Sequence, residues 1–278
     1  MKKHLSTILL ILVFFIGTAV LLYPTISDYV NSKHQSRAIA SYDKAVSACT
    51  SEDFTKVFEA ADEYNKQLRE TPNAFYDPSL VNGYEQALSV DDTGIMGYIS
   101  IDKIKVELPI YHTTDDAVLQ VAAGHLEGSS LPVGGAGTHC VLSGHRGLPS
   151  AKLFTDLDKL EIGDTFTITV LDRLLTYQVD QIKIVLPDEV SDLQIVDGKD
   201  YCTLVTCTPY GINTHRLLVR GVRVANAEEK PVLYVAAEAY RIDPIIVTPV
   251  VAAPMLLILL GVVLVKYRRK KKRKVRSL

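Results

Sequence analysis

The chain has 278 residues, enough for one sizeable domain with accessory segments, and a formal net charge of −2. The charge is unevenly distributed. Residues 266–278 hold nine Lys and Arg and no acid, Lys2 and Lys3 add two more, and the region between keeps 19 basic residues against 32 acidic ones. An acidic middle region argues against nucleic-acid binding, and the basic ends need a separate explanation.

Two uncharged apolar runs, residues 5–23 and 245–265, lie just inside the basic ends. A bilayer core about 30 Å thick requires about 20 apolar residues in a helix, so both runs are long enough to span it. Lys and Arg mark the cytoplasmic side, so we expect both termini inside, residues 24–244 outside, and the basic tail against membrane lipids. A cleaved signal peptide is the alternative for the first run, but no small-residue cleavage site follows it clearly, which favours an uncleaved anchor.

The external part begins with a segment of helical periodicity that extends to residue 70. Thr50 followed by Asp53 predicts a capping box, and therefore the start of a new helix, within it. Thr71-Pro72 predicts the end of that helix. Residues 71–93 are then expected to form a loop with Asp77-Pro78 at its centre.

From residue 95 onward the pattern changes to short strand-like runs separated by Gly, Pro and Asp clusters, with one helical interruption near 115–123. About seven such strands predict a single β-barrel or sandwich of about 130 residues. The predicted strands are 97–101, 106–111, 138–143, 165–170, 174–185, 201–206 and 216–224.

The four cysteines do not have the spacing of a disulfide framework. Few paired cysteines in an external domain are more typical of a Gram-positive cell surface than of a eukaryotic secreted protein. Cys49 and Cys202 are interpreted as buried, non-catalytic thiols. His125, His139 and Cys140 lack the spacings of a strong metal motif, so we expect neither a metal nor another cofactor.

Three residues of the strand-rich region suit nucleophilic catalysis. Cys207 ends a buried strand just before a Pro/Gly turn, where a thiol is held rigidly and can still be reached. Arg216 opens the next strand, and a hairpin would place its guanidinium beside the cysteine as an oxyanion donor. His145 follows another strand and offers an acid/base imidazole. Spacing alone does not bring the three together, and a lone buried cysteine is also an ordinary core residue.

Several stretches carry a family resemblance. The sequence TLVTC at 203–207 resembles the TLxTC signature of sortases, and Arg216 falls where that family places its catalytic arginine. SGHRG at 143–147 resembles the histidine motif of the family, and GHLEGSSLP at 124–132 is similar to a further sortase segment. The similarity covers roughly residues 95–225 in matching order.

The resemblance implies a mainly β fold, a closed and mostly antiparallel barrel of about eight strands, with N-terminal helices, a lid loop and two flanking transmembrane helices. It also implies a cysteine transpeptidase. Cys207 would attack the Thr–Gly bond of an LPxTG-type sorting signal and form a thioester, which an amine then resolves. His145 would serve as acid and base, and Arg216 would orient the substrate or support the oxyanion.

Residues 208–221 and the second apolar run resemble class C, the pilin-polymerising sortases. The implied partners are pilins or surface proteins with an LPxTG-type signal, and the implied acceptor is a pilin lysine. Two alternatives stay open. One is a housekeeping sortase that anchors surface proteins to peptidoglycan, with lipid II as acceptor, and the other is a non-catalytic, membrane-tethered adhesion or sensing domain.

Class C enzymes carry a lid with an Asp-Pro-aromatic motif over the active site. The stretch FYDPS at 75–79 lies in the corresponding region but departs from the motif, because a serine follows Pro78 and the aromatic residues precede Asp77. We therefore expect Tyr76, Asp77 and Pro78 to belong to a lid, with Asp77 as a partner for Arg216 and Tyr76 as a cover for the nucleophile. The alternative is that Asp77-Pro78 merely starts a turn.

The expected organisation, in chain order, combines these elements in a cell-membrane protein of a Gram-positive bacterium with an extracellular catalytic domain. Its parts are a cytoplasmic start (1–4), a signal-anchor transmembrane helix (5–23), an extracellular helical segment (24–70), a lid loop (71–93), the β-barrel (94–226), an extracellular linker (227–244), a second transmembrane helix (245–265) and a basic cytoplasmic tail (266–278).

Overall fold

The computed structural model describes residues 2–90, 93–226, 257 and 261. The linker and the basic tail expected from the sequence lie outside the described residues, as does the second expected transmembrane helix apart from two positions. The chain divides into two units, one formed by Met1–Ile26 with Lys230–Leu278 and the other by Ser27–Glu229.

The first helix, α1, extends from Lys2 to Ser47 and continues through Pro24 without a break. The expected first span at 5–23 therefore lies within a longer helix and does not end where the apolar run ends. Large apolar side chains between Leu12 and Tyr23 are exposed. By length and composition this is the one helix among the described residues that is able to cross a membrane, a property that a signal sequence shares.

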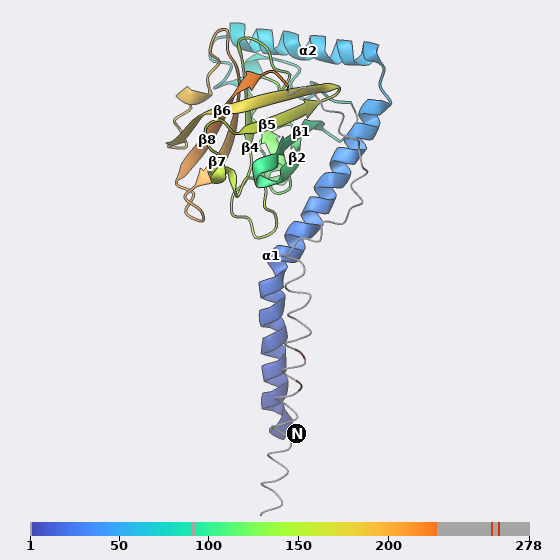
Figure 1. Cartoon of the computed structure of the whole chain (residues 1–278), viewed down its shortest axis with the longest axis vertical. Coiled ribbons are helices and arrows are strands. Elements are labelled where there is room, and N and C mark those ends of the chain that lie inside the picture. Colours follow the sequence, from blue (N-terminus) through green and yellow to red (C-terminus); the bar gives the residue numbers. More distant parts are fainter. Residues whose placement is uncertain (1, 91–92, 227–256, 258–260, 262–278) are drawn as a thin grey trace, which may run out of the picture. The chain divides into compact units, whose positions relative to one another are not determined.

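The second helix, α2, spans Ser51–Glu70 and begins at the predicted capping box. The Thr50 hydroxyl accepts a hydrogen bond from the Asp53 amide at 3.3 Å, and the Thr50 amide donates to the Asp53 carboxylate at 2.8 Å. The apolar face of α2 packs against the barrel at the top of Figure 1. The buried residues on this face are Phe58, Ala61, Tyr64 and Leu68.

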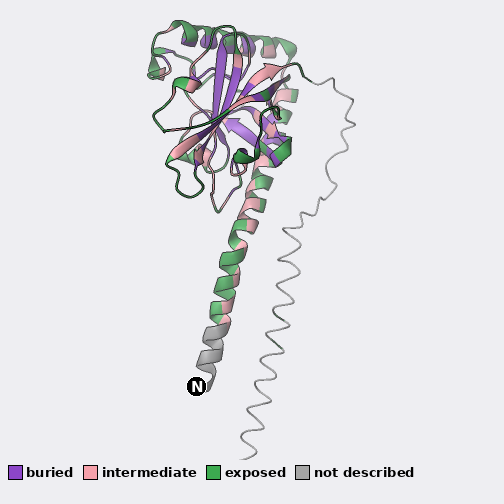
Figure 2. Ribbon diagram, turned by 60° about the vertical axis from the view of Figure 1, so that its left-hand side comes forward, coloured by how far each residue is buried: buried purple, intermediate pink, exposed green. Residues whose placement is uncertain are grey.

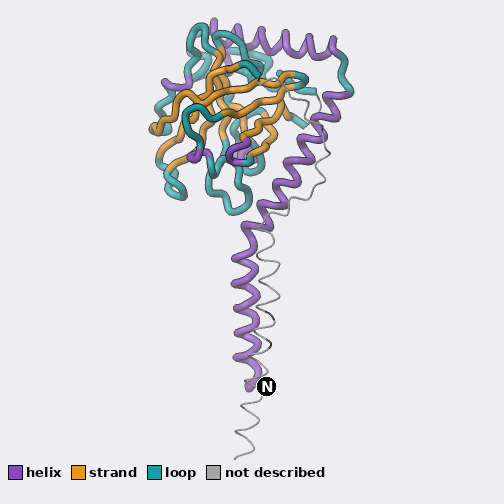
Figure 3. The backbone as a smooth tube through the Cα atoms, viewed as in Figure 1, coloured by secondary structure: helices purple, strands orange, loops and turns teal. Residues whose placement is uncertain are grey.

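Eight strands close into a barrel in the order β1-β2-β3-β4-β7-β8-β6-β5 (Figures 1 and 3). Only β2/β3 and β4/β7 are parallel pairs, so the expected mainly antiparallel barrel is confirmed. The strands are β1 Ile95–Ile101, β2 Val106–Tyr111, β3 Ala123–His125, β4 Thr138–Ser143, β5 Thr165–Val170, β6 Arg173–Val185, β7 Asp200–Thr208 and β8 His215–Val224. The sequence did not indicate β3, because three residues are too few to show an alternating pattern.

Short helical elements occupy several connections between the strands. They are η1 Pro78–Leu80, η2 Asp102–Ile104, α3 Asp116–Leu119, η3 Leu157–Lys159 and η4 Ser191–Leu193. The helical interruption predicted near 115–123 corresponds to α3. In the region predicted as a loop at 71–93, the described residues 71–90 form turns and the single helical turn η1.

The main core fills the barrel interior, coloured purple in Figure 2, and extends under α2. The C-terminal part of α1 is tied to this core by Tyr42, which is fully buried. Its hydroxyl donates to the Met96 carbonyl at 3.2 Å and accepts from the Leu171 amide at 2.9 Å. Two backbone groups of the barrel are thereby satisfied by one helical side chain.

Candidate active site

Three neighbouring strands bring the predicted site residues to one end of the barrel. Strand β8 pairs antiparallel with β7, and Arg216 lies directly opposite Cys207. Strand β4 pairs parallel with β7, and Ser143 lies opposite Val205. His145 follows Ser143 by two residues, as Cys207 follows Val205, so the histidine and the cysteine leave the sheet at the same level.

The backbone around His145 is held from several directions. The Gly144 amide donates to the Val205 carbonyl at 3.0 Å, which continues the β4/β7 ladder by one residue. The buried Thr206 hydroxyl donates to the Gly144 carbonyl at 2.7 Å, and the Phe154 amide donates to the His145 carbonyl at 3.1 Å. A side chain at Gly144 would come within 2.6 Å of the Phe154 ring, so this turn requires glycine.

Cys207 and Arg216 are both half-buried. One guanidinium nitrogen of Arg216, Nη1, donates to the carbonyls of Asn213 at 3.3 Å and His215 at 3.2 Å. Within residues 2–90 and 93–226, no carboxylate forms an ion pair with this arginine. Its remaining N–H donors are therefore available to a carbonyl or an oxyanion that approaches the cysteine.

Arg146 joins the histidine turn to the loop that follows Cys207, a role that sequence reasoning missed. Its side chain is only 10% exposed and forms an ion pair with Asp158. The guanidinium also donates to the Thr208 hydroxyl at 3.4 Å and lies 5.9 Å from the centre of the Tyr210 ring. The available signal was its adjacency to His145 in the SGHRG stretch. That signal was not followed because a basic residue that flanks a turn usually points to solvent.

An apolar surface lies beside Cys207 on the outer face of the sheet. Val141 of β4 and Leu218 of β8 are buried there together with Leu193 of η4. Val205 packs against them, and it precedes Cys207 by two residues on the same face of β7. We call this cluster (Val141, Leu193, Leu218 and the side chains packed on it) the groove floor.

The loop after α2 reaches the groove floor through Phe75, whose ring packs against the cluster. The backbone of the loop comes close because Gly128 has no side chain: a Cβ there would lie 2.8 Å from the Phe75 carbonyl, and φ is +87°. The sequence had nominated Tyr76 as the cover. Tyr76 is instead 66% exposed, so the residue that occupies the groove is its neighbour.

Asp77 and Pro78 lie at the start of η1. The Asp77 carboxylate accepts a hydrogen bond from the Ser79 hydroxyl at 2.6 Å. The expected ion pair between Asp77 and Arg216 is not formed among the described residues, and the Asp77 carboxylate is engaged by the Ser79 hydroxyl of its own turn instead. The serine that replaces the aromatic residue of the motif thus supplies a local partner for the aspartate.

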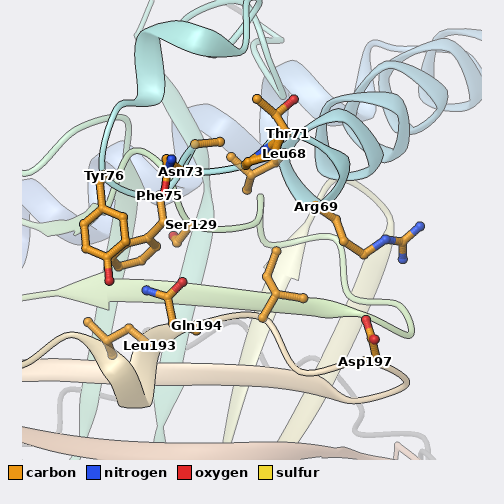
Figure 4. Close-up of a pocket in the computed structure, with 14 residues that line it drawn as sticks. Leu68, Arg69, Thr71, Asn73, Phe75, Tyr76, Ser129, Leu193, Gln194 and Asp197 are labelled. Carbon is orange, nitrogen blue, oxygen red and sulfur yellow. The ribbon is translucent and has the colours of Figure 1, made fainter.

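Phe75 also forms part of the wall of a cavity of about 310 Å³ between the end of α2 and the connection from β6 to β7 (Figure 4). Leu193 and Gln194 line it from the β6–β7 connection, and Arg69 and Asp197 lie at its charged side. Leu193 belongs to both the cavity wall and the groove floor, so the two spaces adjoin.

The buried histidines of the barrel have structural partners. His139 donates through Nδ1 to the Gln194 carbonyl at 2.9 Å and accepts from the Thr203 hydroxyl at Nε2 at 2.7 Å. Burial lowers the pKa of His139. Within the described residues, no group of three or more His, Cys, Asp or Glu is arranged to hold a metal ion.

A closed barrel in which a cysteine near a strand end faces an arginine, with a histidine just beyond the end of the neighbouring strand, is an arrangement suited to nucleophilic catalysis by cysteine. A family model described as the sortase domain matches residues 99–224. The crystal structure of sortase C1 from Streptococcus agalactiae is 55% identical, covers 69% of this chain and 100% of its own, and superposes with a TM-score of 0.63. The chain therefore belongs to the sortase family, and it is a cysteine transpeptidase.

Two further relatives extend the comparison. The structure of Clostridium perfringens sortase C with the C-terminal cell wall sorting motif is 43% identical, covers 69% of this chain and 100% of its own, and gives a TM-score of 0.61. Sortase A of Bacillus anthracis is 26% identical over 235 residues, which is 82% of this chain and 99% of that protein. The two solved structures are thus class C sortases, while the Bacillus anthracis protein is a sortase A.

Proposed function

We propose that the protein is a class C-type sortase that polymerises pili. It cleaves an LPxTG-type sorting signal between Thr and Gly and transfers the acyl group to a lysine amine of the next pilin. The observation that carries the proposal is the loop after α2, whose Phe75 packs on the groove floor next to Cys207. Likeness to solved sortase C structures from two organisms supports the same subclass.

In the first half-reaction, the Cys207 thiolate attacks the threonine carbonyl of the sorting signal. Charge develops on the carbonyl oxygen, and the N–H donors of Arg216 are available to stabilise it. His145 protonates the departing glycine amine, so the Thr–Gly bond breaks and a Cys207 thioester forms. The contacts of Gly144 and Thr206 fix the backbone of the turn that carries His145.

In the second half-reaction, a lysine amine attacks the thioester carbonyl. His145, which lost its proton to the glycine amine in the first step, accepts a proton from this lysine amine. The C–S bond then breaks, and the Cys207 thiolate is restored. The thioester retains acyl reactivity, so transfer to an amine prevails over hydrolysis when water is kept from the groove. A lid ring packed on the groove floor is suited to that exclusion.

The site would work outside the cell membrane. The N-terminal part of α1 is apolar and exposed enough to serve as an anchor. Lys2 and Lys3 lie at its start, which favours an N-terminus on the cytoplasmic side and a barrel outside. The basic segment 266–278 favours a cytoplasmic C-terminus against anionic lipids in a Gram-positive bacterium.

A housekeeping sortase is the second candidate, because the match to a sortase A covers almost the whole of that relative. In that function the acceptor would be an amine of the peptidoglycan stem, supplied by lipid II. A non-catalytic adhesion or sensing role is a third candidate, which the transpeptidase family membership makes weaker.

Two experiments on the full chain in detergent test the proposal. The first incubates it with LPxTG-type peptides and detects the thioester on Cys207 by mass spectrometry, with Cys207→Ala as the control. The second adds a purified pilin that carries the signal and follows linked subunits by gel electrophoresis. A ladder supports pilin polymerisation. A thioester without a ladder, combined with transfer to a peptidoglycan-stem amine, favours the housekeeping function, and no thioester rejects both.

A further inference from the structure

Two cysteines that the proposed reaction does not use face each other inside the barrel. Cys140 lies on β4 and Cys202 on β7, and the two are directly opposite in the parallel register of these strands. Their exposed fractions are 2% and 0%, and both belong to the main core cluster. Both side chains therefore point to the same interior face of the sheet.

The positions meet the spatial requirement of a disulfide. Adjacent strands lie about 4.8 Å apart, and disulfides join residues whose Cα atoms are about 4.4–6.8 Å apart. The two thiols are close enough for each to shift the pKa of the other. A bond between them would thus require adjustment of side-chain torsions, while the strands keep their register.

The surroundings also select which sulfur carries the charge. Burial raises the pKa of the Cys140 thiol, but hydrogen bonds from Cys202 and His125 outweigh burial, so the pKa of Cys140 is lowered. Burial and the hydrogen bond with Cys140 both raise the pKa of Cys202. The opposite shifts show that the two thiols interact in the closed barrel, where both are buried.

We propose that Cys140 and Cys202 form a dithiol–disulfide site that joins the two strands bearing the catalytic histidine and cysteine. The oxidant is an organic disulfide. One of the two cysteines attacks it as a thiolate and releases one thiolate, and the other cysteine then loses its proton and attacks the sulfur of the mixed disulfide, which releases the second. The protein loses two electrons and two protons, and the oxidant is reduced to two thiols. Since both sulfurs are buried, the exchange takes place while the barrel is open, during folding.

A disulfide between Cys140 and Cys202 would join the two strands that lead to the active site. Cys140 lies on β4 five residues before His145, which follows the end of that strand, and Cys202 precedes Cys207 by five residues on β7. The odd spacing places Cys207 on the opposite face of the strand, away from the interior pair. A bond between Cys140 and Cys202 therefore locks the β4/β7 register below the active site and leaves the Cys207 thiol free.

The test uses the full chain in detergent, incubated with oxidised glutathione in a urea series that extends to the opened barrel, so that access does not limit exchange. Free thiols are then blocked with iodoacetamide in full denaturant, so that buried thiols are reached, and the protein is digested without reduction. We expect a peptide cross-linked through Cys140 and Cys202, an intact mass about 2 Da lower before alkylation, and Cys207 recovered as its alkylated form. Reduced and oxidised samples are also compared by thermal melting, with the oxidised one melting higher.

Cys140→Ala and Cys202→Val are the matched variants. Each should lack the cross-link, and neither should show a difference in melting between reducing and oxidising conditions. Recovery of all four cysteines as alkylated thiols at every urea concentration would overturn the proposal. So would a dominant cross-link to Cys207 or Cys49. Because the wild-type cross-link is read directly, the result stands even if a variant fails to fold, and it is independent of transpeptidase activity.

Discussion

Thr206 offers a sharp test of how the fold holds His145, the histidine proposed as acid and base. Its hydroxyl, buried between Val205 and Cys207, donates to the Gly144 carbonyl at 2.7 Å. Thr206→Val keeps the branched shape but leaves that carbonyl buried without this donor, which should cost about 1–3 kcal/mol of unfolding free energy. For a domain of this size each kcal/mol lowers the melting temperature by about 2–4 °C. Because the freed carbonyl belongs to the residue before His145, the imidazole should also shift.

A displacement of about 1 Å at a catalytic group reduces turnover by about 10²-fold, so kcat of Thr206→Val on an LPxTG-type peptide should fall by about 10- to 100-fold. Thr203→Val is the matched control, since it removes a buried hydroxyl from the same strand whose partner is His139 rather than the histidine turn. It should lose comparable stability and keep its kcat within about twofold. If the two variants have the same kcat, the hydrogen bond from Thr206 to Gly144 has no role in positioning His145.

Three shorter predictions concern the charge, the lid and the buried imidazole. Arg216→Lys should lower kcat on a sorting-signal peptide by about 10²–10³-fold, because a lysine does not reproduce the guanidinium fork; unchanged kcat would remove Arg216 from oxyanion support. Phe75→Ala should accelerate alkylation of Cys207 by a bulky maleimide, whereas Tyr76→Ala should not, and equal rates would exclude the ring as a cover. Below pH about 6.5 the unfolded state binds more protons at His139 than the folded state does, because burial lowers the folded pKa, so the unfolding free energy should decrease as the pH is lowered. The denaturant midpoint of His139→Gln should decrease less than that of the wild type when the pH is lowered from 7.5 to 5.

Much of the fold was predictable because its signals are local. The capping box at Thr50 marks the start of α2 to the residue, and alternating apolar residues locate seven of the eight strands within a few positions. Closure of the sheet is not a local property. The β4/β7 pairing joins strands that are far apart in sequence, and only the family resemblance implied a barrel rather than a sandwich.

The candidate site divides along the same line. Cys207 and Arg216 face each other as the hairpin argument predicted, since short-range strand pairing determines that contact. Which loop residue packs near the site was not predictable, because neighbouring side chains of a loop point in unrelated directions: Phe75 packs on the groove floor while Tyr76 is exposed. Arg146 escaped notice because its partners, Asp158 and Thr208, come from separate connections.

The charges around the sheet explain why Arg216 in particular suits the proposed role. Arg146 forms an ion pair with Asp158, and Arg220, two positions further along the same face of β8 from Leu218, forms a bidentate pair with Asp180 at 2.8 and 3.0 Å. A paired guanidinium has its donors engaged and its field largely neutralised. Among the described residues, Arg216 has backbone carbonyls in place of a carboxylate, so its charge stays available beside Cys207. A carboxylate partner would stabilise this arginine and, by the same contact, withdraw its donors from the substrate.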